Sequence, residues 1–177
     1  MVNILPMKFI KNLIISSIIF LLTLHVGHSQ IYLSENFEQA IPEEWNEYVN
    51  DEFKWDTLDG GYLGHPQSAK QGERNAIFQV TSLEQPSTIL VLPSADLSYA
   101  IKPDLNFFHA QEERSGNQDI LEVFYKLGAD STWKFLKEYT NPTSYNEWVQ
   151  RNIQLPDSAL TDSCILGFKA TSNNAFG

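Results

Sequence analysis

The sequence predicts an all-β protein, an antiparallel β-sandwich of the jelly-roll type. A hairpin pattern occupies residues 119–139. About nine short extended segments, separated by turn-forming residues, follow the first thirty residues. No segment in that part of the sequence keeps an apolar period of 3.6 over three helical turns, so we expect helices to be short at most.

The hairpin at residues 119–139 combines two strand patterns with a short turn. In the first strand one face carries Leu121, Val123 and Tyr125, and the other carries Ile120, Glu122, Phe124 and Lys126. In the second, polar residues separate or flank Trp133, Phe135 and Leu136. The sequence Gly-Ala-Asp-Ser at 128–131 supplies the turn, because glycine takes positive φ freely and Asp and Ser bond to their own backbone. A strand pair of this kind predicts an antiparallel hairpin within a sandwich.

The other expected strands are read from alternation and from their bounding turns. In chain order they cover residues 31–37, 53–57, 75–81, 87–92, 104–110, 147–155 and 163–170. The segment 87–92 (STILVL) is a buried apolar strand that ends at Pro93. In the last segment, Cys164, Leu166 and Phe168 share one face.

Two loops interrupt this pattern. Residues 58–74 form a long, polar, glycine-bearing loop, and residues 111–118 form a polar, charged loop that we expect to be exposed. Long structured loops in compact domains tend to be functional or to wrap a site. If the chain has a working surface, we expect it at these two loops.

Residues 1–29 have the pattern of a secretory signal peptide. Lys8 and Lys11 precede an apolar run at residues 12–26, and the small residues Gly27 and Ser29 follow it. We place the cleavage after Ser29, and Met7 is an alternative start. A membrane anchor is the competing interpretation, but about 15 apolar residues are fewer than the roughly 20 that span a bilayer. The predicted location is therefore secreted or cell-surface, and no transmembrane span is expected in the mature chain.

The mature part, residues 30–177, is strongly acidic. It holds ten of the 12 basic residues and all 22 acidic ones, because the leader contributes only Lys8 and Lys11. Nucleic-acid binding is disfavoured, since phosphate neutralisation needs clustered Lys and Arg. An acidic exported protein is a plausible host for Ca²⁺, and a surface kept soluble by charge is the alternative.

The sequence contains no recognisable catalytic constellation. Cys164 is the only cysteine, so no intramolecular disulfide can form, and we expect it to be a small buried hydrophobe. His65 and His109 are interpreted as surface or packing histidines, and the pair Glu112–Glu113 beside Arg114 as part of a charged loop. We therefore predict no catalytic residue and no enzymatic activity of this chain.

The four tryptophans are expected to anchor the core or to lie half-buried. They are Trp45, Trp55, Trp133 and Trp148. An exposed one on a sugar- or protein-binding face is the alternative interpretation.

The order of several motifs resembles the MAM-like jelly-roll modules of bacterial surface proteins. These include the cleaved-adhesin domains of gingipain-type peptidases and related exported proteins of Bacteroidetes, of the choice-of-anchor J kind. The motifs are ENFEQAIPEEW, GHPQSAKQGERNAIF, TILVLPSADLS, LNFFHA, DILEVFYKLGADSTWKFL, NEWVQRNIQLP and CILGFKATSNNAFG. The resemblance covers residues 31–177 and implies one β-sandwich domain over residues 30–177.

The sequence departs from that family at its end. Family members continue past the Ala-Phe-Gly position into a strand that ends in an Ile-Asp-Asp-Val type motif, whereas this sequence stops at Gly177. We expect the domain to be C-terminally incomplete, lacking its final strand. Four inward apolar side chains on such a strand contribute roughly 6–12 kcal/mol of burial, against a whole-domain stability of about 5–15 kcal/mol.

The resemblance also implies one structural Ca²⁺ that joins the first strand to the long loop. Its ligands map to Glu38 and to the neighbourhood of Glu73 and Asn75, largely through backbone carbonyls, with Glu35 as an extra ligand. The acidic pair that completes the family site has no counterpart in this sequence.

The resemblance implies a secreted, non-catalytic adhesion or binding module, an accessory domain of a larger exported protein. Its partners are an extracellular protein or carbohydrate ligand and the other domains of the parent protein. Two alternatives stay open. The chain is a fragment of a secreted peptidase or glycoside hydrolase whose catalytic domain lies elsewhere, or it is a structural spacer without a ligand.

Overall fold

The computed structural model describes residues 30–49, 53–80, 85–111, 113–114, 117–140, 143 and 147–173. The chain divides into two units, residues 1–31 and residues 32–177, and the β-sandwich is formed by the second. The predicted signal peptide, residues 1–29, lies outside the described residues.

The larger layer is a five-stranded antiparallel sheet. Its order is β1 (Asn46–Tyr48), β4 (Ser87–Val91), β11 (Cys164–Thr171), β8 (Ile120–Leu127) and β9 (Lys134–Tyr139). β11 and β8 are the longest strands and pair along their whole length, from Cys164 opposite Leu127 to Thr171 opposite Ile120. The predicted hairpin is confirmed as β8 and β9, which pair antiparallel, and β9 is an edge strand of the sheet.

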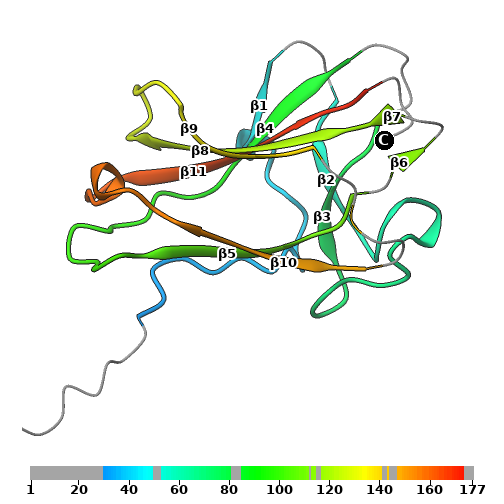
Figure 1. Cartoon of the computed structure of the whole chain (residues 1–177), viewed down its shortest axis with the longest axis horizontal. Coiled ribbons are helices and arrows are strands. Elements are labelled where there is room, and N and C mark those ends of the chain that lie inside the picture. Colours follow the sequence, from blue (N-terminus) through cyan, green and yellow to red (C-terminus); the bar gives the residue numbers. More distant parts are fainter. Residues whose placement is uncertain are drawn as a thin grey trace, which may run out of the picture. The chain divides into compact units, whose positions relative to one another are not determined.

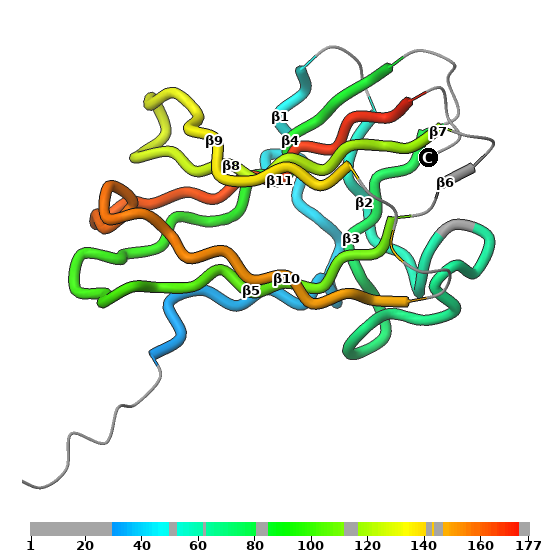
Figure 2. The backbone as a smooth tube through the Cα atoms, in the orientation of Figure 1, coloured from blue at the N-terminus to red at the C-terminus, as the bar shows by residue number. Residues whose placement is uncertain are grey.

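The facing side of the sandwich consists of two separate strand pairs. One pair is β10 (Val149–Gln154) with β5 (Asp104–His109), and the other is β2 (Trp55–Leu58) with β3 (Asn75–Phe78). In Figure 1, β5 and β10 run below the larger sheet, and Figure 2 shows the same layering along the backbone. Phe107 of β5 joins the layers, because its ring contacts Phe168 at 5.1 Å and Tyr139 at 5.9 Å between centroids.

The described residues contain only short helical turns, as predicted. They are three 3-10 segments, η2 (Glu43–Trp45), η3 (Tyr62–Gly64) and η4 (Asp157–Ala159). Strands make up most of the regular structure. The predicted all-β sandwich is confirmed.

The core lies between the layers and follows the predicted alternation. Leu121, Val123 and Tyr125 of β8 face inward and are buried. From the neighbouring strands, Leu90, Leu166 and Cys164 join them. The interpretation of Cys164 as a small buried residue is confirmed.

The alternation breaks in β9, where Phe135 and Leu136 are consecutive. The register shifts there: Val123 pairs with Lys137 and Phe124 with Phe135, so one residue of β9 is unpaired. This bulge lets Leu136 pack against the core while Phe135 stays 57% exposed on the outer face. Tyr139, three residues after the unpaired Leu136, points inward and contacts the Phe107 ring.

The outer face of the larger sheet carries a small packed cluster that strand alternation did not indicate. The Trp133 ring lies on β11 at Gly167, and Lys126 Nζ lies 4.4 Å from the centroid of that ring. Glu47 accepts a hydrogen bond from Trp133 Nε1 at 2.9 Å and forms an ion pair with Lys126 at 3.4 Å. Lys126 is therefore buried, although it lies on the outer face of the sheet.

The first predicted strand, residues 31–37, is not a strand. Tyr32, Leu33 and Phe37 pack against the core, but the segment has no ladder partner among the described residues. Glu35 Oε1 accepts the N–H groups of Asn36 and Phe37, and Phe37 has φ of 58°. This local turn ends the extended conformation before a ladder can form.

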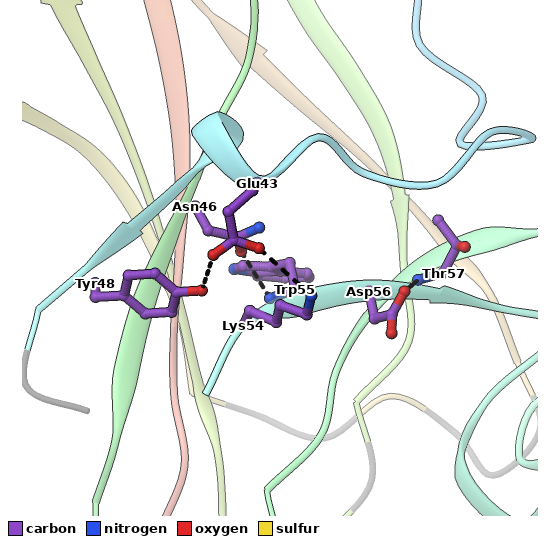
Figure 3. Close-up of polar contacts among 7 residues, drawn as sticks. All are labelled: Glu43, Asn46, Tyr48, Lys54, Trp55, Asp56 and Thr57. Carbon is purple, nitrogen blue, oxygen red and sulfur yellow. Dashed lines mark hydrogen bonds and ion pairs between the residues drawn. The ribbon is translucent and has the colours of Figure 1, made fainter. Parts of the chain in front are cut away.

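The edge strand β1 was not predicted, since NEY is short and polar. It pairs with β4, and the side chain of its first residue binds the start of β2: Asn46 Oδ1 accepts the Trp55 N–H at 2.8 Å. Figure 3 shows this corner, where Glu43 also bonds to Tyr48 at 2.5 Å and to Lys54 at 3.4 Å. Side-chain capping, not hydrophobic patterning, places this strand.

The predicted loop at residues 111–118 contains a second unpredicted ladder. β6 (Glu113–Arg114) and β7 (Asn117–Gln118) pair as an antiparallel ribbon of two residues each. Glu112 lies outside the described residues. The segment is a strand ribbon rather than the expected irregular loop.

Candidate functional site

A cavity of about 580 Å³ opens between the layers, beside the long loop at residues 58–74. All four residues of β3 line it, as do residues 106–110 at the end of β5 and the N-terminal segment 34–37. Its floor is formed by inward side chains of the larger sheet, including Leu90, Leu121 and Phe168. We call this space the interlayer cavity.

The long loop folds back on itself and forms one side of the interlayer cavity. The Gly61 N–H donates to Pro66 O at 2.8 Å, and Ala69 N–H donates to Asp59 Oδ1 at 3.3 Å. A Cβ at Gly61 would lie 1.9 Å from His65 O, so this reversal requires glycine. The expectation that this loop wraps a site agrees with its position.

Glu38 joins the N-terminal segment to the end of the long loop. Its Oε1 accepts the backbone N–H groups of Glu73 at 2.9 Å and Arg74 at 3.3 Å. The approach is close: a Cβ at Gly72, where φ is +68°, would lie 1.9 Å from Glu38 Oε1. The structure thus places the Glu38 carboxylate beside the backbone of Glu73 and Arg74, and whether calcium binds there stays a prediction.

The other predicted ligands differ in their surroundings. Glu35 binds its own turn through Oε1, whereas Asn75 has a buried Oδ1 without a hydrogen-bond partner among the described residues. Glu38 Oε1 already accepts two N–H groups, which leaves Oε2 as the oxygen of that carboxylate without a hydrogen bond from the loop. The described residues contain no group of three His, Cys, Asp or Glu side chains placed to hold a metal.

Three residues that line the interlayer cavity have polar atoms that are shut off from solvent: His109, Gln111 and Asn75. Asn75 Oδ1 has no hydrogen-bond partner among the described residues, whereas the His109 and Gln111 side chains interact with each other. His109 is only 7% exposed. Burial and, to a smaller extent, the positive charge of Arg151 together lower the pKa of His109 from 6.5 to about 4, against the opposing effect of a hydrogen bond with Gln111.

The solvent side of the cavity carries aromatic and basic groups. Lys70 Nζ lies 4.6 Å from the centroid of Phe108, which is 42% exposed. Trp148 Nε1 donates to Ser68 O at 3.0 Å, and Arg74 donates to Thr57 O at 2.8 Å. We call Lys70, Arg74, Phe108 and Trp148 the cavity rim. A rim of this composition can contact acidic or apolar groups of a ligand.

The predicted roles of the remaining candidates are mostly as expected. All four tryptophans are half-buried. Burial raises the pKa of the Cys164 thiol, which disfavours the nucleophilic thiolate. His109 packs inside the sandwich, 5.5 Å from Tyr139 between ring centroids, and His65 lines the interlayer cavity.

Sequence reasoning found one side of the cavity and missed the other. The loop at 58–74 was predicted as a functional surface, whereas the contributions of β3 and β5 were not. The sequences of β3 and β5 have an ordinary strand pattern. A strand edge without a ladder partner cannot be predicted from that pattern. The polar residues Asn75 and His109, within otherwise apolar strand segments, were the only indication in the sequence that these strands line a cavity.

The strand order and the layering define the class of fold, an antiparallel β-sandwich. Among solved structures, the chain is similar to the crystal structure of the K1 cleaved adhesin domain of Lys-gingipain from Porphyromonas gingivalis W83. The TM-score is 0.53 at 17% sequence identity, over 79% of this chain and 94% of that domain. This likeness supports the cleaved-adhesin-like fold.

Comparison by sequence gave no match. No family model matches the chain, and no curated protein matches it. In the part of the chain that the structure describes, no helix is both long and apolar enough to cross a bilayer.

Proposed function

We propose that this chain is a secreted, non-catalytic adhesion module, an accessory domain of a larger exported protein that binds an extracellular protein or glycan. The observation that carries the proposal is the fold likeness, which extends over 94% of a domain described as a cleaved adhesin. The leader pattern at residues 1–29 supports export.

The cavity rim is the surface we assign to ligand binding. It combines an exposed aromatic ring, Phe108, with the basic side chains of Lys70 and Arg74. In a chain of net charge −10, these cations stand out as groups that attract an acidic or hydroxyl-rich ligand. Aromatic faces and fixed donors are the groups that bind sugars and peptides.

A glycan array and a pull-down from extracellular matrix test the proposal. We expect the mature chain to bind at least one of the two, and the Phe108→Ala and Lys70→Ala variants to lose most of that binding. Phe135→Ala is the matched control, since Phe135 is an exposed aromatic on the outer face of the other sheet. If the mature chain binds neither surface, the spacer interpretation is favoured.

A further inference from the structure

The outward side of the β5–β10 ladder is rich in amide side chains. Its three cross-strand pairs are Asp104 with Gln154, Asn106 with Asn152, and Phe108 with Gln150. All six side chains are exposed, so no described segment covers them, whereas the residues that alternate with them are at least partly buried. Each pair contains an amide, and none of the six residues is basic. We call these six side chains the amide face.

Strand propensity does not explain the amide face. Asn and Asp are depleted in strands, yet Asp104, Asn106 and Asn152 take three of its six positions. The outer face of the larger sheet is instead made polar by charges, such as the ion pair of Lys169 with Glu122 at 2.7 Å. Residues that local propensity disfavours are expected where a surface has a function.

Two amides of this face hold each other in place. Asn152 Nδ2 donates a hydrogen bond to Asn106 Oδ1 at 2.8 Å. Because an amide has donor hydrogens as well as an acceptor oxygen, the bonded pair still offers a donor at Asn106 Nδ2 and an acceptor at Asn152 Oδ1. A sugar hydroxyl is also both a donor and an acceptor. The amide pair is therefore matched to hydroxyl groups and needs no charged partner.

An aromatic ring lies at one end of the amide face. Phe108 is 42% exposed although Lys70 Nζ lies 4.6 Å from its ring centroid, so ring surface remains available to a ligand. Trp148 precedes β10, and its Nε1 donates to the backbone of the long loop at 3.0 Å. Asn106, Phe108, Trp148 and Gln150 also line the interlayer cavity, which therefore reaches this end of the face.

The charge and the polarity of the face favour one class of extracellular ligand. Asp104 is its only acidic residue and the whole chain has a net charge of −10, so the face does not attract an acidic polymer. Protein interfaces are enriched in aromatic residues and Arg at their centre, whereas this face has a single Phe and no Arg. A neutral sugar chain offers hydroxyls to the amides and an apolar C–H face to the ring.

We propose that the amide face binds an extended, neutral oligosaccharide. One sugar stacks on Phe108, and the next sugars exchange hydrogen bonds with Asn106, Asn152 and Gln150 along the ladder. Asp104 accepts a hydroxyl proton at the far end. Two paired strands of six residues give a face roughly 20 Å long, enough for several sugar units. The inference rests on the proposed adhesion function and names its ligand class.

Calorimetric titration of the mature chain with cellohexaose, mannohexaose and xylohexaose tests the proposal. We expect saturable binding of at least one of the three at concentrations up to about 1 mM. Phe108→Ala is expected to weaken it by about tenfold and Asn152→Ala by about fivefold, because they remove the stacking ring and a hydrogen-bonding amide. Failure of all three sugars to bind would overturn the proposal.

Two matched controls lie outside the amide face. Phe135 is an exposed ring on the other sheet, and Gln79 is an exposed amide after β3. Phe135→Ala and Gln79→Ala should keep the wild-type affinity. In NMR spectra, the bound sugar should shift the side-chain amide signals of Asn106, Gln150 and Asn152 and leave that of Gln79 unchanged. Equal losses in the control variants, or shifts that avoid the amide face, would contradict the assignment.

An acidic chain tests the preference for neutral sugars. Hexagalacturonic acid is expected to bind at least about threefold more weakly than the best neutral hexasaccharide. Asp104→Asn should reduce that difference, because it removes the carboxylate and keeps the shape of the side chain. Tighter binding of the acidic chain would overturn the proposal.

The results separate this inference from the adhesion proposal. Retention of the chain by matrix proteins, with no binding of the neutral hexasaccharides, would support adhesion and overturn the sugar assignment. Loss of that retention in Asn152→Ala would then identify a protein partner on the same face. Silence in the titration, the array and the pull-down together would overturn both proposals.

Discussion

At the scale of single residues, burial of polar groups produces the properties that sequence reasoning missed. His109 occupies a strand position that faces the core, so its imidazole loses water without gaining a full set of partners. Gly167 matters because it has no side chain, which leaves space for the Trp133 ring. Both His109 and Gly167 lead to a measurable prediction.

The burial of His109 predicts a loss of stability in weak acid. Its folded-state pKa is about 4 against 6.5 when exposed, so the unfolded state binds the proton first as the pH falls. Stability is therefore full above pH 6.5 and decreases toward pH 4, by about 3 kcal/mol over the window. Arg151 and Tyr139 are the titratable groups that face the imidazole.

Urea unfolding of the wild type and His109→Gln at several pH values measures this effect. The variant is expected to have a flatter profile between pH 6.5 and 4, because it has no imidazole to protonate. Parallel profiles for the two proteins would show that His109 is not responsible. A comparison at pH 7.5 separates this effect from the packing cost of the substitution.

Gly167 is required by the Trp133 ring. A Cβ there would lie 2.7 Å from Trp133 Cη2 and 2.9 Å from Ile89 Cγ2. Gly167→Ala is expected to cost about 1–3 kcal/mol of unfolding free energy. In a Trp133→Ala background the cost should fall markedly, and a double-mutant cycle measures that coupling. Additive effects of the two substitutions would show that the ring does not set the requirement.

At the scale of elements, local turns and capping side chains decide which segments form ladders. Residues 31–37 have strand composition but end in the Glu35 turn, whereas the polar β1 is fixed by Asn46 at the start of β2. The β9 bulge is a similar case, in which two consecutive apolar residues are placed on opposite faces.

The Glu38 contact predicts how the long loop is held. Glu38→Ala removes the acceptor of the Glu73 and Arg74 N–H groups and is expected to cost about 1 kcal/mol. Limited proteolysis should show faster cleavage within residues 58–74 than in the wild type. Glu44→Ala is the control, since Glu44 is an exposed acid of a short helical turn. Equal cleavage rates in the two variants would show that the Glu38 carboxylate does not hold the loop.

At the scale of the whole molecule, the sandwich has one continuous sheet and one interrupted layer. The facing layer consists of two strand pairs, β10–β5 and β2–β3, with the interlayer cavity between them. No ladder joins these two pairs among the described strands.

The calcium prediction is tested at this scale. If Ca²⁺ binds near Glu38 and Asn75, a hundredfold excess over Kd adds about 2.7 kcal/mol. The expected rise in Tm is several degrees relative to the chain in chelator. The Asn75→Ala variant should lose this rise if its free Oδ1 is a ligand. An unchanged Tm in the wild type would remove calcium from the description.

The sequence by itself determined the fold class, the β8–β9 hairpin, the burial of Cys164 and the position of most strands. These follow from local periodicity and turn chemistry, which are written into consecutive residues. The tertiary structure alone decided the β9 bulge, the burial of Lys126 under Trp133, the unpaired edge of β5 and the interlayer cavity. Each of these depends on which segments meet across the sandwich, and contacts between distant residues are not encoded in the alternation of any single strand.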